Sequence, residues 1–214
     1  MDSRNRTEMF TVWYDRYETL IYDMEQAAHK LYQLRYQMSN GGNLSVRVPN
    51  EERMIVKKTD VAFDEVCAET LIVTDFEGNV IEGIGKPSKE ALLHGAIYKN
   101  IPRAGAIMHC HSPYATAWAA NHDSLDFSTH HAFLKFHGKV PVFDTHSYAV
   151  PKEYFPEITT FLAEHESSNA FLLRAHGQVT LANDMRMATY LAELMEETAQ
   201  ISVLSAAAAN CVSL

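Results

Sequence analysis

"AIMHCHSPYAT", residues 106–116, places two histidines one residue apart at the end of an apolar run, and a segment that reads as helix follows. On a strand, residues i and i+2 face the same side, with Cβ atoms roughly 6–7 Å apart. His109 and His111 can therefore converge on one cation, with bonds of about 2.0–2.1 Å. Taken alone, the pair is also compatible with two polar side chains at a strand end.

A third histidine stands at the end of another apolar run. His176 follows "AFLLRA" (170–175) and precedes Gly177. A histidine at such a strand-to-turn corner suits a site at the edge of a sheet, although it is also typical of a turn histidine packed against glycine. Three neutral imidazoles leave one or two positions open on Zn²⁺, which is the pattern of a catalytic site.

An acidic residue precedes the histidine pair by about twenty positions. "KPSKE" (86–90) predicts a helix capped by Ser88, with Glu90 in its first turn. A lone glutamate there usually compensates the helix dipole. Beside a metal-bound carbonyl compound, however, a carboxylate can take the α-proton while the metal stabilises the enediolate. His94 shares this helix face, and we expect it to fix Glu90 or to pack rather than to bind metal.

Length and composition limit the class of protein to which the chain can belong. The 214 residues fit one large domain, and 47% apolar with 21% charged residues is typical of a soluble globular chain. The net charge of -9 argues against general nucleic-acid binding. The polar start "MDSRNRTEMF" lacks the apolar core of a secretion signal, and no run is long enough to span a membrane. We therefore expect a cytoplasmic protein.

The three cysteines predict neither a disulfide framework nor a thiolate zinc site. Cys67, Cys110 and Cys211 are scattered, and no pair has C-x-x-C spacing. Cys110 lies between the two histidines, so on a strand it points to the opposite face. We expect the Cys110 side chain to be buried in the core.

Periodicity predicts a mixture of helices and strands. Residues 7–38 read as helix, in one or two pieces, and the chain then turns at "SNGGNLS" (39–45). The other expected strands are 44–48, 53–58, 71–75, 79–83, 104–112, 139–144 and two within 169–182. The other expected helices are one from Ser88, 113–121 and 184–209. Short hairpins among the early strands favour a sheet covered by helices over a regular βαβ repeat.

Four motifs in order resemble the class II aldolase/adducin-head family, which includes the fuculose-phosphate aldolases. They are "GGNLS" (41–45), "KPSKE" (86–90), "HCHS" (109–112) and "AHGQV" (175–179), and the resemblance covers about residues 22–204. It implies one α/β/α three-layer domain around a mostly antiparallel mixed sheet, spanning 22–214 after a helical extension at 1–21. It also implies a homotetramer with active sites at subunit boundaries.

The same resemblance implies roles for single residues. His109, His111 and His176 would hold Zn²⁺, with Mn²⁺, Co²⁺ and Fe²⁺ left open, and Glu90 would be the acid/base. His130 and His131 in "STHHAF" (128–133) lie where such families carry a second acid/base.

The resemblance also implies a substrate-binding set, and here the chain departs from the family pattern. The set is Gly42, Asn43, Ser45, Thr59, Ser88 and Lys89. Asp60 stands where these aldolases have Gly, and Lys89 replaces a second Ser. Two like charges 4 Å apart repel by ~4 kcal/mol at an effective dielectric of 20. Lys89 can offset that by pairing with Asp60 or by binding the anion. We expect a small anionic substrate, with either a phosphate or a carboxylate.

These residues favour a zinc-dependent lyase of carbohydrate metabolism. The first hypothesis is an aldolase that cleaves a small phosphoketose or keto acid through a metal-bound enediolate. A decarboxylase or dehydratase can use the same metal site. Three histidines and a carboxylate can also hold iron(II) in an oxygenase. A non-catalytic scaffold like the adducin head predicts no stoichiometric metal.

Overall fold

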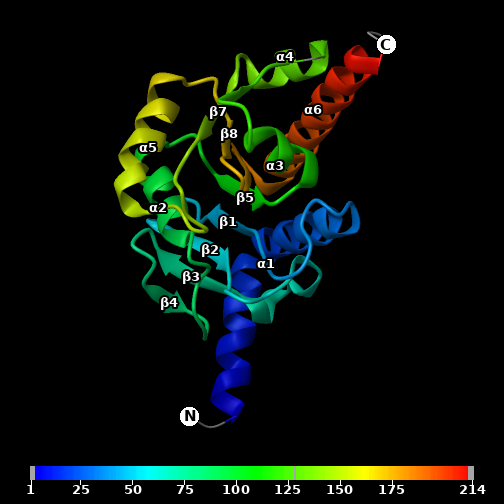
Figure 1. Cartoon of the computed structure of the whole chain (residues 1–214). Coiled ribbons are helices and arrows are strands. Elements are labelled where there is room, and N and C mark those ends of the chain that lie inside the picture. Colours follow the sequence, from blue (N-terminus) through cyan, green and yellow to red (C-terminus); the bar gives the residue numbers. More distant parts are fainter. Residues whose placement is uncertain (1–2, 128, 212–214) are drawn as a thin grey trace.

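The computed structural model describes residues 3–127 and 129–211 (Figure 1). The start of the predicted extension 1–21, Ser128 of "STHHAF" and the last three residues of the predicted domain lie outside the described residues. In chain order the elements are α1 (Ser3–Gln33), β1 (Asn43–Arg47), β2 (Arg53–Lys57), the 3₁₀ turns η1 (Phe63–Glu65) and η2 (Ala68–Thr70), β3 (Leu71–Asp75), β4 (Val80–Glu82), α2 (Ala91–Asn100), β5 (Ala106–Cys110), α3 (Pro113–Ala119), β6 (Ser124–Leu125), α4 (His130–Phe136), β7 (Val140–Phe143), η3 (Lys152–Tyr154), α5 (Phe155–Glu164), β8 (Ala170–Leu173), β9 (Gly177–Ala182) and α6 (Met185–Cys211).

The strands form one nine-stranded sheet. Their order is β4-β3-β2-β1-β5-β9-β8-β7-β6, and all neighbours are antiparallel except the pair β7–β8. The predicted mostly antiparallel mixed sheet is therefore confirmed. β5 lies between β1 and β9, so the histidine-bearing strand occupies the centre of the sheet.

Helices cover both faces of the sheet, which confirms the three-layer architecture. α1 and α6 lie on one face, and α2 and α5 lie on the other (Figure 1). Along β5, Met108 and Cys110 pack into the cluster under α1 and α6, while Ile107 packs under α2 and α5. Strand alternation thus buries Cys110 as expected and turns His109 to the α2 side.

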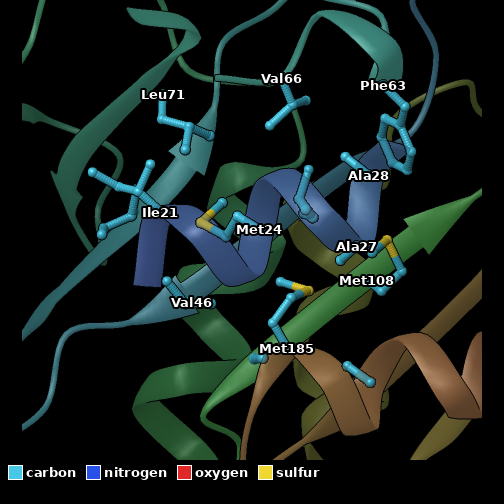
Figure 2. Close-up of a cluster of buried hydrophobic side chains, with 14 of the residues drawn as sticks. Ile21, Met24, Ala27, Ala28, Val46, Phe63, Val66, Leu71, Met108 and Met185 are labelled. Atoms are coloured by element: carbon cyan, nitrogen blue, oxygen red, sulfur yellow. The ribbon is translucent and has the colours of Figure 1, made fainter. Parts of the chain in front are cut away.

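α1 contributes an apolar stripe to the first cluster. Ile21, Met24 and Ala28 are fully buried at helical spacing against Val66 and Leu71 (Figure 2). The predicted domain boundary after residue 21 falls inside this continuous helix, beside a core residue. That boundary stays a prediction.

The end of the first helix and the start of α2 differ from the predictions. The first helix ends at Gln33 instead of residue 38, because the chain turns at Arg35 with a positive φ of 60°. α2 begins at Ala91, so the prediction that Ser88 caps it is wrong. The Ser88 N–H donates to the Lys57 carbonyl, and Pro87 pairs with Lys58, so this segment is extended beside the end of β2.

The predictions did not include α4, α5, β6 and the three 3₁₀ turns. Among the described helices, none combines the length and apolarity that a bilayer crossing requires.

Candidate metal centre

Pairing of the central strands brings the three predicted ligands together. His109 lies on β5, His111 follows it, and His176 lies in the turn between β8 and β9. The Nε2 atom of His109 is 3.1 Å from that of His111 and 3.3 Å from that of His176. The three ligand atoms all lie within 4.8 Å of one another. Antiparallel pairing of β5 with β9 makes this possible, because it places His109 opposite Val179 near the start of β9.

The hydrogen bonding of His109 fits a cation. Its Nδ1 lies 2.9 Å from the Gln178 carbonyl, which can only accept, so Nδ1 carries the hydrogen and Nε2 presents a lone pair. Burial lowers the pKa of His109 to about 4, so the ring is neutral at pH 7. Its Nε2 nevertheless faces a Glu90 oxygen at 3.1 Å. The lone pair of His109 Nε2, the Glu90 oxygen and the ring nitrogens of the other two histidines repel one another unless a cation lies between them.

The distances agree with this interpretation. Tetrahedral bonds of ~2.0–2.1 Å place neighbouring ligand atoms about 3.3 Å apart. Burial, followed by the neighbouring His109, lowers the pKa values of His111 and His176 to about 4 as well. All three rings are therefore in the neutral form that binds metal. The residues fit a divalent cation with one or two positions left open.

The glycine turn before β1 packs directly on the ligands. The Gln37 side-chain oxygen accepts the backbone N–H of His111 at 2.9 Å. A Cβ atom on Gly41 would lie 2.9 Å from Nδ1 of His111. Gly42 has a φ of +61°, and a Cβ there would lie 2.8 Å from the His109 carbonyl. No sequence motif predicted the role of Gln37, because that role depends on its contact with His111, 74 residues later in the chain.

Glu90 is buried beside the histidine cluster. It occupies the cap position of α2, one residue before the helix, and is 6% exposed. The Asn43 side-chain amide donates to Glu90 Oε2 at 2.9 Å, and Asn43 lies opposite His109 in the register of β1 and β5. Asn43 was predicted to bind an anion, but its side chain contacts Glu90. It holds the carboxylate in place.

His94 lies behind this carboxylate in a separate buried network. Its Nδ1 is 2.8 Å from the Ser45 hydroxyl, which also contacts the Tyr98 hydroxyl at 2.8 Å. Burial and, to a lesser extent, the neighbouring His109 lower the pKa of His94 to about 3. His94 therefore packs as a neutral ring, and it is not one of the three clustered histidines.

The predicted anion-binding segments lie side by side next to α2. The Thr59 N–H donates to the Lys86 carbonyl at 3.0 Å, and the Ser88 N–H donates to the Lys57 carbonyl. The buried ammonium of Lys57 holds the 58–61 turn by donating to the carbonyls of Lys58 and Val61. Thr59 and Ser88 are half-buried, whereas Asp60 and Lys89 are exposed.

Lys89 points to a different partner from the one expected. Its ammonium lies over the Tyr148 ring, 4.9 Å from the centroid. The ion pairs of the described residues do not include Lys89 with Asp60, so the predicted pairing is not seen.

His130 and His131 occupy the first turn of α4, and both are exposed. In the part of the chain that the structure describes, neither belongs to the histidine cluster or to the cleft beside it. Their role as a second acid/base stays a prediction.

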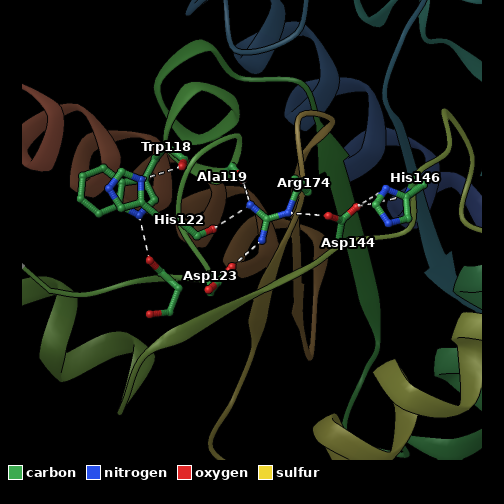
Figure 3. Close-up of polar contacts among 8 residues, drawn as sticks. Trp118, Ala119, His122, Asp123, Asp144, His146 and Arg174 are labelled. Carbon is green, nitrogen blue, oxygen red and sulfur yellow. Dashed lines mark hydrogen bonds and ion pairs between the residues drawn. The ribbon is translucent and has the colours of Figure 1, made fainter.

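A cleft of about 700 Å³ opens beside the ligands. His111 and His176 line it together with Asp144, His146, Ser147, Tyr148, Arg174 and Ala175. Asp144 forms an ion pair with Arg174 through one carboxylate oxygen, and its other oxygen faces His146 (Figure 3). The sequence interpretation missed these residues. The only available signal was an acid and a histidine two positions apart in "DTHSY" (144–148), directly after a strand.

Comparisons with known proteins agree with the fold. The family model "Class II Aldolase and Adducin N-terminal domain" matches residues 23–203. An L-fuculose phosphate aldolase of Methanococcus maripaludis is 33% identical over 179 residues, covering 82% of this chain and 91% of that protein. A 3-oxo-tetronate 4-phosphate decarboxylase of Haemophilus influenzae is 35% identical over 190 residues, covering 83% and 84%.

A solved structure gives the same fold. The L-fuculose-1-phosphate aldolase of Thermus thermophilus superposes with a TM-score of 0.79 at 23% identity, covering 89% of this chain and 96% of that one. Together with the family match, this places the chain: it belongs to the class II aldolase and adducin N-terminal domain family.

Proposed function

We propose that this protein is a metal-dependent lyase that breaks a carbon–carbon bond next to the ketone of a small anionic compound. One observation carries the proposal. The buried carboxylate of Glu90 lies 3.1 Å from the Nε2 of His109, at the point where three neutral imidazoles converge. A base at a cation site is the arrangement that enolisation of a ketone requires.

His109, His111 and His176 would hold a divalent cation, with zinc as the first candidate. When bound, such a cation polarises a carbonyl and stabilises the negative charge of an enediolate. Glu90 delivers a proton to the enediolate carbon after bond cleavage, or removes it in the reverse direction. Asn43 holds Glu90 in place through its 2.9 Å hydrogen bond.

The names of the relatives give two compounds, L-fuculose 1-phosphate and 3-oxo-tetronate 4-phosphate, whose cleavage shares one intermediate. Retro-aldol cleavage of L-fuculose 1-phosphate and decarboxylation of 3-oxo-tetronate 4-phosphate both leave the enediolate of dihydroxyacetone phosphate. Only the departing group differs: an aldehyde in the first case and carbon dioxide in the second. One protonation by Glu90 completes either reaction. Decarboxylation is therefore the second candidate, favoured by the 35% identity to the decarboxylase.

The anionic group of the substrate would bind between the two segments beside α2. Thr59 and Ser88 offer hydroxyls there, and the exposed ammonium of Lys89 provides positive charge near the cleft through its contact with Tyr148. Gly42, also in the predicted set, lies in the turn that packs on the three histidines. A phosphate or carboxylate fits this combination of hydroxyl donors and a cation.

The test uses both compounds and one product. Protein stripped with a chelator is reloaded with Zn²⁺, Mn²⁺, Co²⁺ or Fe²⁺ and incubated with each compound. Dihydroxyacetone phosphate is measured by enzymatic reduction. We expect metal-dependent release from at least one compound, with carbon dioxide release identifying a decarboxylase. Absence of product from both compounds with every metal would contradict the proposed function.

A further inference from the structure

We propose that His146, in place of the predicted His130 and His131, is the second acid/base of the lyase, and that Asp144 and Arg174 are positioning residues that orient it. The inference rests on the proposed function and requires that the reaction is aldol cleavage, not decarboxylation. All three residues line the cleft that also contains His111 and His176. A group in that wall can reach the part of a substrate that lies away from Glu90.

Arg174 is held in one orientation by partners on all three nitrogens. Its Nε lies 2.7 Å from Asp144 Oδ2, and its Nη2 lies 2.5 Å from Asp123 Oδ1. Its Nη1 donates to the Ala119 carbonyl at 3.3 Å. Figure 3 shows this guanidinium between the end of α3 and Asp144. A planar guanidinium group whose three nitrogens all have protein partners has little freedom to bind substrate. Arg174 therefore acts by fixing Asp144.

Asp144 in turn orients His146. Its second oxygen, Oδ1, lies 3.0 Å from Nδ1 of His146 and accepts the backbone N–H of His146 at 3.3 Å. In the tautomer with its hydrogen on Nδ1, the ring places that hydrogen next to the carboxylate and leaves the lone pair on Nε2. The imidazole is 79% exposed, so Nε2 is accessible from the cleft. Carboxylate, imidazole and a free Nε2 form the arrangement by which acid–base histidines are oriented.

The backbone at this wall is held in a costly conformation. His146 has a φ of 48° and Ala175 a φ of 50°, both in the left-handed region. A non-glycine residue in this region is strained and persists where surrounding contacts impose it, commonly at functional sites. Both residues line the same cleft, and Ala175 directly precedes His176.

The proton balance of an aldol cleavage requires such a group. The hydroxyl on the carbon that becomes the aldehyde gives its proton to Nε2 of His146. The O–H electrons form the new C=O bond, the C–C bond breaks, and its electron pair remains in the enediolate. Glu90, which has taken a proton from solvent, then protonates the enediolate carbon, and His146 returns its proton to solvent before the next turnover. Decarboxylation has no hydroxyl proton to remove, so His146 matters only for the aldol reaction.

The test separates the two half-reactions. His146→Asn keeps a side chain that tolerates a positive φ but removes the base. Its matched control is His137→Asn, because His137 is also exposed, has a φ of 55°, and lies outside the cleft. Cleavage is measured with L-fuculose 1-phosphate. Proton exchange is measured by NMR with dihydroxyacetone phosphate in D₂O, a reaction that needs Glu90 but no second base.

We expect His146→Asn to lower the kcat of cleavage by roughly 10²–10⁴-fold. Proton exchange and metal content should stay at the values of the wild-type protein, which also shows that the variant is folded. Asp144→Asn should lower the kcat of cleavage by at least about tenfold, with KM and exchange unchanged. His137→Asn should change neither reaction.

Three results would overturn the assignment: cleavage unaffected by His146→Asn, an equal loss of cleavage and exchange, or a wild-type protein that only decarboxylates. A wild-type protein that releases product from neither compound would overturn the proposed function itself, which distinguishes the two failures.

Discussion

The Nε2 atoms of His109, His111 and His176 face one another as neutral groups, and this has a consequence for stability. Burial lowers each pKa from 6.5 to about 4 in the folded, metal-free protein. Between these values the unfolded chain binds more protons, so the free energy of unfolding rises with pH. The stabilisation is present above about pH 6.5 and is lost as pH falls towards 4.

We therefore expect metal-free protein to lose more than about 1.4 kcal/mol of unfolding free energy from pH 7 to pH 5, the equivalent of one pKa unit for one group. Urea denaturation at both pH values measures this. His109→Gln should weaken the dependence because it removes one of the three rings. Equal stability of the wild-type protein at the two pH values would show that the imidazoles are not held neutral by the fold.

The ligand set makes a second prediction at the scale of single residues. Replacing His109, His111 or His176 by Ala should each weaken metal affinity by more than about 100-fold, since each removes one of three ligands from a preformed site. Metal content after dialysis measures the loss. His165→Ala is the control, because that histidine is exposed and stacks on Phe161. A variant that retains full metal content removes its residue from the set.

At the scale of elements, the turns that carry the ligands depend on close backbone contacts. A Cβ atom on Gly177 would lie 2.5 Å from the Cys110 carbonyl and 3.1 Å from the His111 ring. A Cβ atom on Gly105 would lie 2.0 Å from the Asn183 carbonyl at the opposite end of the pairing between β5 and β9. Both glycines permit close packing, but only Gly177 touches a ligand.

Gly177→Ala should therefore lower the stability by about 1–3 kcal/mol and also weaken metal binding. Gly105→Ala should lower the stability by a similar amount and leave metal affinity unchanged. Thermal unfolding with and without Zn²⁺, together with metal titration, measures both effects. Equal metal affinity of the two variants would mean that the turn at Gly177 does not position His111.

Local patterns explain which parts of the fold and site were predictable. Alternation along 106–111 is sufficient to place Cys110 in the core and both histidines on the other side, because a strand has a period of two. The cap at Ser88 was wrong because a hydrogen bond to Lys57, 31 residues earlier, keeps that segment extended. Gln37 and Arg174 could not be found, since each acts through contacts that no local pattern records.

At the scale of the whole molecule, the resemblance predicts a homotetramer. Three large apolar side chains at α4 and at the cleft are exposed in the single chain: Phe133 (64%), Leu134 (63%) and Tyr148 (78%). Exposed apolar side chains that gather on one surface typically contact another subunit, and Phe133 and Leu134 are consecutive in α4. Light scattering after size-exclusion chromatography should give about 96 kDa, four times the 24.1 kDa of one chain. A mass of one chain would contradict the prediction.

The measurement that tests the central claim most directly is proton exchange at the carbon next to a ketone. Metal-loaded wild-type protein should exchange the C–H proton of dihydroxyacetone phosphate with D₂O. Glu90→Gln should bind the same amount of metal and exchange roughly 10²–10⁴-fold more slowly, because the proton acceptor is gone. Exchange at the wild-type rate in Glu90→Gln, or no exchange in the metal-loaded wild-type protein, would contradict the account.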